Sequence, residues 1–489
     1  VFTGHFWKMG PIVDGTHYND VTEKTEVYQC TAPYDRTISV GSVVFSETQM
    51  IEKALSTAHQ YFPEWSDTEV QERAQYLYKL ADLLESNMPE LIALCHHEAG
   101  KTIHDCIDEV REAVDFCRYY AQQAVDNFSN AETDVSFDGI TQQIRHQGKG
   151  VFVCISPWNF PLAIFLSQIG AALVAGNTVI AKPAEQTSLI AVRTVLLMLE
   201  AGFPKQCIQL LTGNGAQIGS ALTADHRIAG VVFTGSTGTA QVINRNLAKR
   251  PLLPATFVAE TGGQNAMIVD STALPEQVAR DVVRSAFASA GQRCSALRVL
   301  FIQQDVAERV IELIKGAMQE LAVGLPYLHS TDVGPVIDKT AKDKLNAHLQ
   351  KMIAEHKLLA QVALNDSCAK GDFISPTAIE IDNLGQLSEE QFGPILHVIR
   401  FKAAELDNVI EQINNTGFGL TMGVHSRNER AYTHIAEMSR VGNCYINRDQ
   451  VGAVVGVQPF GGQGLSGTGP KAGGPRYLHR FTQQIVSSC

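Results

Sequence analysis

The chain has 489 residues, of which 45% are hydrophobic and 18% charged, and its 51 acidic and 39 basic side chains give a net charge of −12. This composition is typical of a folded α/β protein with about two domains, and it excludes a disordered or fibrous chain. The basic residues are scattered along the sequence, so no surface for nucleic acid is expected.

The ten cysteines have no paired short spacings, which is typical of free thiols in a reducing, cytoplasmic compartment rather than of a disulfide framework. Neither Cys-x-x-Cys nor His-x-x-x-His occurs, so no metal is expected. The most apolar stretch, 161–181, is interrupted by polar residues and glycines. It predicts a buried helix and strand rather than a membrane span.

The first 126 residues are predicted to be mainly helical after a strand at 40–45. Ser46 is the expected N-cap of a helix ending near residue 59, and the sequence Ser-Asp-Thr-Glu at 66–69 is the expected capping box of a helix over 70–85. Asn87 and Pro89 begin a third predicted helix, which Gly100 ends. A long amphipathic helix is predicted over 103–125.

The polar stretch 127–150 predicts a β-hairpin, because Asp138-Gly139 lies between two short runs of strand character. A two-stranded hairpin is only marginally stable alone in water, so it is expected to dock elsewhere, with a partner subunit as one candidate. The C-terminal run 480–487 also has strand character and is predicted to pair with the hairpin.

From residue 150, strands and helices alternate, which predicts a parallel sheet with ligands at the carboxyl ends of its strands. Strands are expected at 151–155, 177–181, 208–211 and 230–233, each followed by a loop rich in glycine or proline. A second α/β unit is predicted to begin near residue 257.

Residues 287–294 predict a helix that ends at Gly291, followed by a turn that presents the thiol of Cys294. A thiol becomes a strong nucleophile only as the thiolate, which Arg293 or a helix beginning at Ser295 could stabilise. Glu260 leads into two glycines and is a candidate base. Together a thiol and a carboxylate can form and then hydrolyse a thioester, although a lone cysteine is more often buried and inert.

Three further motifs have a functional and a purely structural interpretation. The loop containing Gly235 and Ser236 could hold a pyrophosphate at a helix start, or it is an ordinary strand-to-helix turn. Lys182 could bind a ribose or phosphate, or it is a solvated surface lysine. The amide of Asn159 could stabilise an oxyanion, or it closes an Asx-turn.

Taken together, these residues resemble the NAD(P)-dependent aldehyde dehydrogenase superfamily over nearly the whole chain. The motifs that support the resemblance occur in the family's order: Pro157-Trp-Asn-Phe-Pro161, Lys182-Pro-Ala-Glu185, Phe233-Thr-Gly-Ser236, Glu260-Thr-Gly-Gly263, Gly291-Gln-Arg-Cys294, Glu390-Gln-Phe-Gly-Pro394 and Pro459-Phe-Gly-Gly462. One departure is Ala240, where many members of the family have glycine.

The resemblance implies a role for each motif. Cys294 would be the nucleophile, Asn159 with the backbone N–H of Cys294 the oxyanion hole, and Glu260 the base that activates the hydrolytic water. NAD would be the cofactor, and the carboxylate of Glu185 favours NAD⁺ over NADP⁺ without deciding between them. The residues implied in cofactor binding are Ile155, Ser156, Pro157, Trp158, Lys182, Glu185, Gly215, Gly235, Ser236, Thr261, Gly262, Glu390 and Phe392.

A narrower resemblance is to L-glutamate γ-semialdehyde (1-pyrroline-5-carboxylate) dehydrogenases, above all to the dehydrogenase part of bifunctional proline utilization A proteins. It rests on residues 112–121, 447–460 and 467–475. It implies that Ser295, Gly452 and Ala453 bind the substrate's α-carboxylate and that Phe160 and Phe460 pack on its aliphatic chain. Asp449 stands where asparagine is expected. The start at Val1 fits a domain cut from such a protein, with an FAD-dependent proline dehydrogenase upstream.

The resemblance also implies the domain organisation. Residues 1–126 and 147–256 would form a Rossmann-like NAD-binding domain and 257–445 a catalytic α/β domain, whose active-site and anchor loops continue to 474. Residues 127–146 and 475–489 would form a β element for a homodimer or a higher oligomer. The alternatives are oxidation of another small carboxylated aldehyde, a CoA-acylating dehydrogenase, a non-redox cysteine hydrolase and a catalytically silent protein of the same fold.

Overall fold

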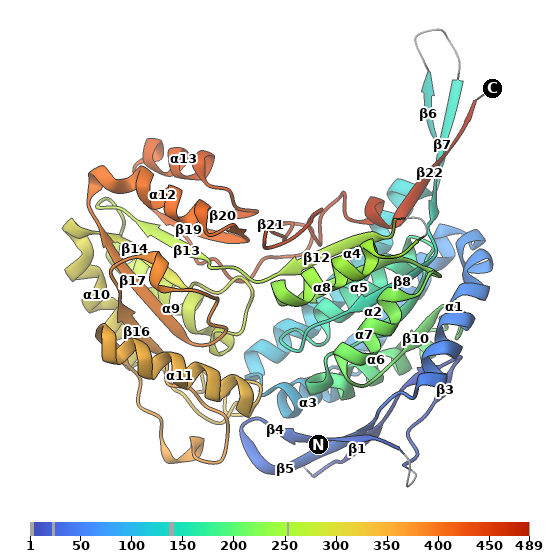
Figure 1. Ribbon diagram of the computed structural model, residues 1–489, viewed down its shortest axis with the longest axis horizontal. Coiled ribbons are helices and arrows are strands. Elements are labelled where there is room, and N and C mark those ends of the chain that lie inside the picture. The colour runs from blue at the N-terminus through green and yellow to red at the C-terminus, as the bar shows by residue number, and fades with distance from the viewer. Residues whose placement is uncertain (1–3, 22–24, 136–140, 252–253, 489) are drawn as a thin grey trace.

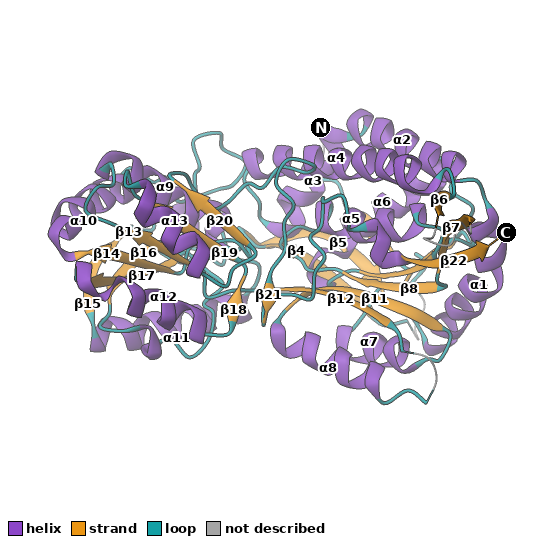
Figure 2. Ribbon diagram, turned by 90° about the horizontal axis from the view of Figure 1, so that it is seen from above, coloured by secondary structure: helices purple, strands orange, loops and turns teal. Residues whose placement is uncertain are grey.

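The computed structural model describes residues 4–21, 25–135, 141–251 and 254–488. Two seven-stranded sheets form its framework, and helices cover both faces of each sheet (Figure 1, Figure 2). This confirms the predicted α/β class. Within the described residues, no helix combines the length and the hydropathy needed to cross a membrane.

The first sheet has the strand order β12-β11-β8-β9-β10-β2-β3, in which the first five strands are parallel, β2 is antiparallel to β10, and β3 is antiparallel to β2. Its strands are β2 (Ile12–Val13), β3 (Thr16–His17), β8 (Val151–Ile155), β9 (Thr178–Lys182), β10 (Ile208–Leu210), β11 (Ile228–Gly235) and β12 (Thr256–Thr261). The helices packed on it are α1 (Thr48–Asp67), α5 (Ala163–Val174), α6 (Ser188–Glu200), α7 (Gly215–Ala224) and α8 (Thr237–Ala248). Because helices lie on both faces, the strands are continuous apolar runs.

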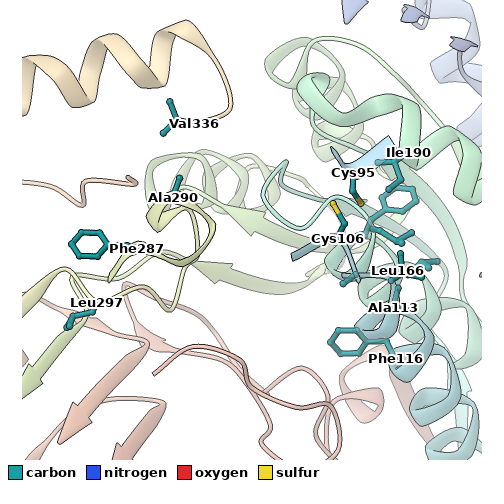
Figure 3. Packing of buried hydrophobic residues seen from close by; sticks show 14 of the residues in the cluster. Cys95, Cys106, Ala113, Phe116, Leu166, Ile190, Phe287, Ala290, Leu297 and Val336 are labelled. Atoms are coloured by element: carbon teal, nitrogen blue, oxygen red, sulfur yellow. The ribbon is translucent and has the colours of Figure 1, made fainter. Parts of the chain in front are cut away.

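A second helical layer lies outside α5 and α6. It consists of α2 (Val70–Ser86), α3 (Met88–Ala99) and α4 (Ile103–Phe128). Figure 3 shows Ala113 and Phe116 of α4 on the same side of the view as Leu166 of α5, all three buried in one apolar cluster. Phe287, Ala290 and Leu297, which flank the predicted nucleophile, lie on the opposite side of that view.

The second sheet has the order β15-β16-β17-β14-β13-β19-β20, parallel except for the edge strand β15. Its strands are β13 (Ala266–Val269), β14 (Val299–Gln303), β15 (Lys357–Gln361), β16 (Thr377–Glu380), β17 (Ile395–Phe401), β19 (Thr421–His425) and β20 (Asn443–Ile446). Its helices are α9 (Pro275–Phe287), α10 (Gln304–Gln319), α11 (Lys339–Glu355), α12 (Leu406–Asn415) and α13 (Glu429–Met438).

Three small sheets complete the fold: β1 (Trp7–Met9) with β4 (Val27–Ala32) and β5 (Asp35–Val44), β18 (Phe418–Gly419) with β21 (Gln463–Gly464), and β6 (Glu132–Val135) with β7 (Thr141–Gly148) and β22 (Thr482–Ser488). The last of these projects from the body of the molecule (Figure 1). The predicted pairing of the C-terminal strand with the hairpin is confirmed, since β22 runs antiparallel to β7. The Asp138-Gly139 turn lies outside the described residues.

Two predicted helix caps are wrong, although the helices themselves are present. Helix α1 begins at Thr48 after Glu47, and α2 begins at Val70 after Glu69, and neither N-terminus has a side-chain cap. Helix α1 extends to Asp67, so Ser66 lies within it and is not free to cap α2. By contrast, Gly100 ends α3 as predicted, with a left-handed φ of 67°.

The second α/β unit does not begin at residue 257, because β12 pairs in parallel with β11 as the edge strand of the first sheet. The second sheet starts with β13, only four residues after β12 ends. Glu260 therefore belongs to the first sheet and Cys294 to the second unit. The proposed division into cofactor-binding, catalytic and oligomerisation domains otherwise stays a prediction.

Candidate active site

The turn that carries Cys294 begins with left-handed backbone. Helix α9 ends at Phe287, and Ser289, Ala290 and Gly291 follow with φ angles of 54°, 55° and 67°. A Cβ atom at Gly291 would lie 2.2 Å from the carbonyl oxygen of Gly393, so only glycine fits there. The predicted helix over 287–291 is therefore wrong, because left-handed residues cannot continue a right-handed helix.

Arg298 holds this turn from inside the protein. Its side chain is 2% exposed, Nη1 donates to the carbonyl of Gly291 at 2.7 Å, and Nη2 donates to the carbonyl of Arg293 at 3.0 Å. Nη2 also contacts the carboxylate of Glu390 at 3.0 Å. The sequence does not predict this role of Arg298, because no local pattern distinguishes a buried guanidinium from a surface one.

The charges around Cys294 disfavour its thiolate. Burial first, and then the carboxylates of Glu260 and Glu390, raise the pKa of this thiol to about 12, whereas Arg298 acts weakly in the other direction. The backbone N–H of Ser295 also favours the thiolate. A thiol with this pKa is almost entirely protonated at neutral pH.

Neither of the two sources of positive charge suggested by the sequence, the guanidinium of Arg293 and a helix N-terminus at Ser295, stabilises the thiolate of Cys294. The guanidinium of Arg293 forms a buried ion pair with Asp105 of α4 at 2.7 Å and donates to Ser289 Oγ at 2.8 Å. Residues 295–298 form no helix and lead directly into β14. The sequence could not show this, because Asp105 is 188 residues away along the chain.

Both carboxylate oxygens of Glu260 are buried and make no close hydrogen bond among the described residues, and only the backbone N–H of Gly462 and the charge of Lys471 act to lower its pKa. Burial raises the pKa of this carboxyl to about 8. The chain approaches it closely, since a Cβ atom at Gly461 would lie 2.7 Å from Oε1. An unpaired carboxyl that titrates near physiological pH is suited to proton transfer in catalysis.

Asn159 lies in the loop after β8 and faces the nucleophile turn. Its Nδ2 atom donates to the backbone carbonyl of Gln292 at 3.0 Å, and the backbone carbonyl of Asn159 accepts from Lys101 Nζ at 2.8 Å. It lines a small cavity with Trp158 and Lys101, adjacent to but distinct from the larger cavity that contains Cys294. One amide hydrogen of Asn159 is thus engaged with the backbone two residues before Cys294.

The larger cavity has a volume of about 940 Å³ and opens to solvent. It brings together all the residues predicted to bind the substrate, as well as the thiol and the carboxyl: Phe160, Glu260, Cys294, Ser295, Gly452, Ala453 and Phe460. Phe160 is packed under two cations, with Lys101 Nζ 4.2 Å and the Arg293 guanidinium 5.6 Å from its ring centre. Glu112 also lines the cavity, and burial raises its pKa to about 8.

Three donors at this cavity have no acceptor among the described residues: the hydroxyl of Ser295 and the backbone N–H groups of Gly452 and Ala453. Their neighbours are satisfied, since Val451 N–H bonds to Asp449 and Val454 N–H bonds to Gln458. Gly452 has a φ of 79°, a conformation that favours glycine. Converging unpaired donors of this kind suit a carboxylate ligand.

A third cavity, of about 550 Å³, lies at the start of α8 and is lined by Thr237, Ala240 and Thr261. Ser236 caps this helix, since its Oγ accepts from the N–H of Thr239 at 3.2 Å. Nothing lies within 4 Å of the position of a Cβ atom at Gly238, so the first helical turn is open. An open helix N-terminus beside a cavity fits a phosphate group.

Lys182 and Glu185 lie together at the carboxyl end of β9. Lys182 is buried with its Nζ 3.9 Å from the carboxylate of Glu185, and burial lowers its pKa to about 8. Glu185 in turn accepts from the N–H of Gly215 at 2.5 Å. The pair therefore offers a donor and an acceptor side by side, which fits the hydroxyl groups of a ribose.

The remaining residues predicted to bind the cofactor lie at strand ends of the first sheet and in the loop that contains Glu390. The carboxylate of Glu390 lies against the backbone of Gly262, where a Cβ atom would be 1.8 Å from Oε2. Phe392 stacks edge-on against Trp158 at 5.6 Å between ring centres. Ile155, Ser156 and Pro157 continue from β8, and Thr261 and Gly235 end β12 and β11. The donors, carboxylates and aromatic rings fit a dinucleotide that spans the two sheets.

The described residues contain no group of three or more histidine, cysteine, aspartate or glutamate side chains arranged to hold a metal ion.

The pKa of Cys294 predicts slow alkylation of the protein without cofactor. At pH 8 the thiol is expected to react with iodoacetamide at least ~100-fold more slowly than free cysteine, because almost none of it is thiolate. The rate is expected to increase about tenfold per pH unit from pH 7 to 10. Mass spectrometry of the peptide containing Cys294 measures this rate. Alkylation at the rate of free cysteine at pH 7 would contradict the buried, protonated state.

The described geometry can be compared with that of known proteins. The model of the aldehyde dehydrogenase family matches residues 20–486. The bifunctional protein PutA of Klebsiella aerogenes is 49% identical over 485 residues, which cover 98% of this chain and 36% of that protein. The chain therefore spans about a third of the length of this bifunctional relative. The 1-pyrroline-5-carboxylate dehydrogenase of Geobacillus sp. (strain WCH70) is 37% identical over 91% of this chain and 87% of its own length.

Two solved structures are also similar. The 1-pyrroline-5-carboxylate dehydrogenase from Thermus with bound NAD superposes with a TM-score of 0.93 at 34% identity, covering 98% of this chain and 92% of that one. A mutant of proline utilization A from Bradyrhizobium japonicum superposes with a TM-score of 0.88 at 52% identity, covering 91% and 45% of the two chains. With a family match over nearly its whole length, the chain belongs to the aldehyde dehydrogenase family.

Proposed function

We propose that this protein oxidises L-glutamate γ-semialdehyde, the open form of 1-pyrroline-5-carboxylate, to L-glutamate with NAD⁺, as the second step of proline catabolism. The observation that best supports this is the large cavity, in which the thiol, an unpaired carboxyl and three unpaired donors meet. The relatives named 1-pyrroline-5-carboxylate dehydrogenase support the same substrate. The donors would hold the α-carboxylate while the aldehyde carbon lies against Cys294 Sγ.

The chemistry of the chain's own residues follows in two stages. First, Cys294 Sγ bonds to the aldehyde carbon while its thiol proton passes to water in the open cavity, and the Asn159 amide with the Cys294 N–H donates to the oxygen that gains negative charge. When bound, NAD⁺ accepts a hydride from the carbon attached to sulfur, which leaves a thioester on Cys294. In the second stage, Glu260 takes a proton from water, the water oxygen bonds to the thioester carbon, and the thiolate of Cys294 leaves.

The decisive test is NADH formation, followed by absorbance, with L-glutamate γ-semialdehyde, succinate semialdehyde and propanal. We expect kcat/KM for the glutamate compound to exceed that for propanal at least ~100-fold, because hydrogen bonds to a charged group contribute about 1.5–3 kcal/mol each. Equal values for the three aldehydes would overturn the assignment of substrate but not the aldehyde dehydrogenase chemistry. No NADH from any of them would favour a catalytically silent protein.

Asn159→Ala is expected to lower kcat by about 10²–10³-fold, because one oxyanion donor is lost. KM is expected to change little, since the amide acts on charge that develops during the reaction. Asn159→Asp is the matched variant: it keeps the size of the side chain, replaces the donor by an acceptor, and should be at least as slow. A wild-type kcat in both variants would remove Asn159 from the mechanism.

The projecting sheet of β6, β7 and β22 supports a proposal about assembly. Ile485 and Val486 of β22 are 47% and 55% exposed in the single chain, and such apolar exposure on a sheet suits a partner subunit. We expect a homodimer or a higher oligomer, which light scattering of the wild type and of an Ile485→Lys, Val486→Lys variant can measure. A wild-type monomer at micromolar concentration would contradict it.

Two further parts of the proposal concern the cellular context. The likeness to bifunctional PutA proteins supports an FAD-dependent proline dehydrogenase as a partner domain in the intact chain. A cytoplasmic location is supported by the cysteines, since Cys294 and eight others are free within the described residues.

A further inference from the structure

Gln450 is a fully buried polar residue at the start of the loop that presents Gly452 and Ala453. Its backbone N–H donates to Ser285 Oγ of α9 at 3.1 Å. Its side-chain Nε2 donates to the carbonyl of Ser295 at 3.2 Å, and lies 3.3 Å from Thr421 Oγ1. One side chain therefore joins this loop to the residue that follows the nucleophile.

The carbonyl groups of Cys294, Ser295 and Ala296 are held by three side chains. Asn265 Nδ2 donates to the carbonyls of Cys294 at 2.6 Å and of Ala296 at 3.0 Å. Thr421 Oγ1 donates to the carbonyl of Ser295 at 3.1 Å, and this carbonyl also accepts the hydrogen bond from Gln450. With these carbonyls anchored in the interior, the hydroxyl of Ser295 is left free at the cavity.

Of these three side chains, Gln450 alone belongs to the loop of Gly452 and Ala453. Asn265 precedes β13, and Thr421 begins β19, so both join the nucleophile turn to the second sheet. The loop itself is built around open backbone, with Gly452 at a φ of 79° and free space on all sides of its Cβ position. Few contacts therefore set the distance between this loop and Ser295. The hydrogen bond from the Gln450 amide to the carbonyl of Ser295 is one of these contacts and joins the two directly.

We propose that Gln450 is a positioning residue that fixes the spacing between the hydroxyl of Ser295 and the N–H groups of Gly452 and Ala453. This inference rests on the proposed function, in which those three donors bind the carboxylate of the substrate. Gln450 touches neither substrate nor cofactor in this scheme. It acts through Ser295, and its effect is therefore limited to aldehydes that carry a carboxylate at the right distance.

The test compares wild type, Gln450→Met and Thr421→Val. Methionine keeps the length of the side chain and removes the donor, whereas Thr421→Val removes the other donor to the same carbonyl but leaves the link to the loop. Gln450→Met is expected to raise KM for L-glutamate γ-semialdehyde about tenfold, with kcat for that substrate and kcat/KM for propanal within about twofold of wild type. Thr421→Val is expected to keep the wild-type ratio between the two aldehydes.

Two outcomes would overturn the inference: an unchanged ratio in Gln450→Met, or an equal loss for both aldehydes in that variant. If Gln450→Met does not fold, Gln450→Asn takes its place, since its amide is one methylene too short to reach Ser295. The proposed function is judged separately, on wild type. A wild type without preference for the carboxylated aldehyde refutes the function, whereas a selective wild type with an equally selective Gln450→Met refutes only the role of Gln450.

Discussion

Cys294→Ser is expected to lower kcat/KM for every aldehyde by at least ~10⁴-fold while the protein still folds and binds NAD⁺. The substitution changes one atom in a cavity of about 940 Å³, so packing is barely affected. The hydroxyl, however, is a far weaker acid than the thiol, whose own pKa is already raised to about 12 by burial and by two neighbouring carboxylates. No nucleophile remains to form the covalent intermediate.

NADH absorbance with L-glutamate γ-semialdehyde measures this loss, and quenching of protein fluorescence by NAD⁺ measures cofactor binding. Cys444→Ser is the matched control, because Cys444 lies on β20 and is partly exposed but does not line the cavity. It should be as active as wild type. Sustained turnover by Cys294→Ser would exclude a mechanism through this thiol, and loss of activity in both variants would point to damage of the fold instead.

Glu260→Gln is expected to give a burst of NADH stoichiometric with the enzyme, followed by steady turnover that is about 10²–10⁴-fold slower than in wild type. Formation of the thioester does not need this carboxyl in the proposed scheme, but hydrolysis does. An acyl-enzyme should therefore accumulate on Cys294, and mass spectrometry of the intact protein should detect it. Steady turnover at the wild-type rate, with no acyl-enzyme, would assign the base to another residue.

The pH dependence of wild type follows from the same carboxyl. Burial raises its pKa to about 8, and the base is the ionised form, so steady-state turnover should rise with pH up to about 8 and then level off. Stability changes in the opposite sense. Between the ordinary pKa of 4.5 and about 8 the folded state keeps a proton that the unfolded state releases, so the free energy of unfolding decreases as pH rises through this range.

Glu260→Gln should therefore resist heat better than wild type at pH 9, and lose that advantage below pH 4.5. Glu98→Gln is an informative control, since burial raises the pKa of Glu98 to about 8 as well. Unlike Glu260, its carboxylate is partnered: it accepts from the N–H groups of Leu189 and Ile190 at the start of α6. Its replacement should cost stability without producing a burst of NADH.

The amino-acid sequence by itself determined the class of fold and the chemical residues of the candidate site. Alternating strands and helices predicted the parallel sheets, because buried parallel strands are continuous apolar runs between helices. The order of short motifs indicated the family, which the match over residues 20–486 confirmed. Glycines also carried information, since Gly100 and Gly291 have left-handed backbone at places where a Cβ atom would collide with a neighbouring residue.

Only the tertiary structure decided how the residues of the candidate site are arranged in space and which of them are in contact. It assigned Glu260 to the edge of the first sheet, gave Arg293 an ion-pair partner in Asp105, and placed Arg298, Asn265 and Gln450 around the nucleophile turn. These contacts join residues up to 188 positions apart, so no local pattern predicts them. The electrostatic state of Cys294 has the same origin: burial and long-range charge set its pKa, and both exist only once the chain has folded.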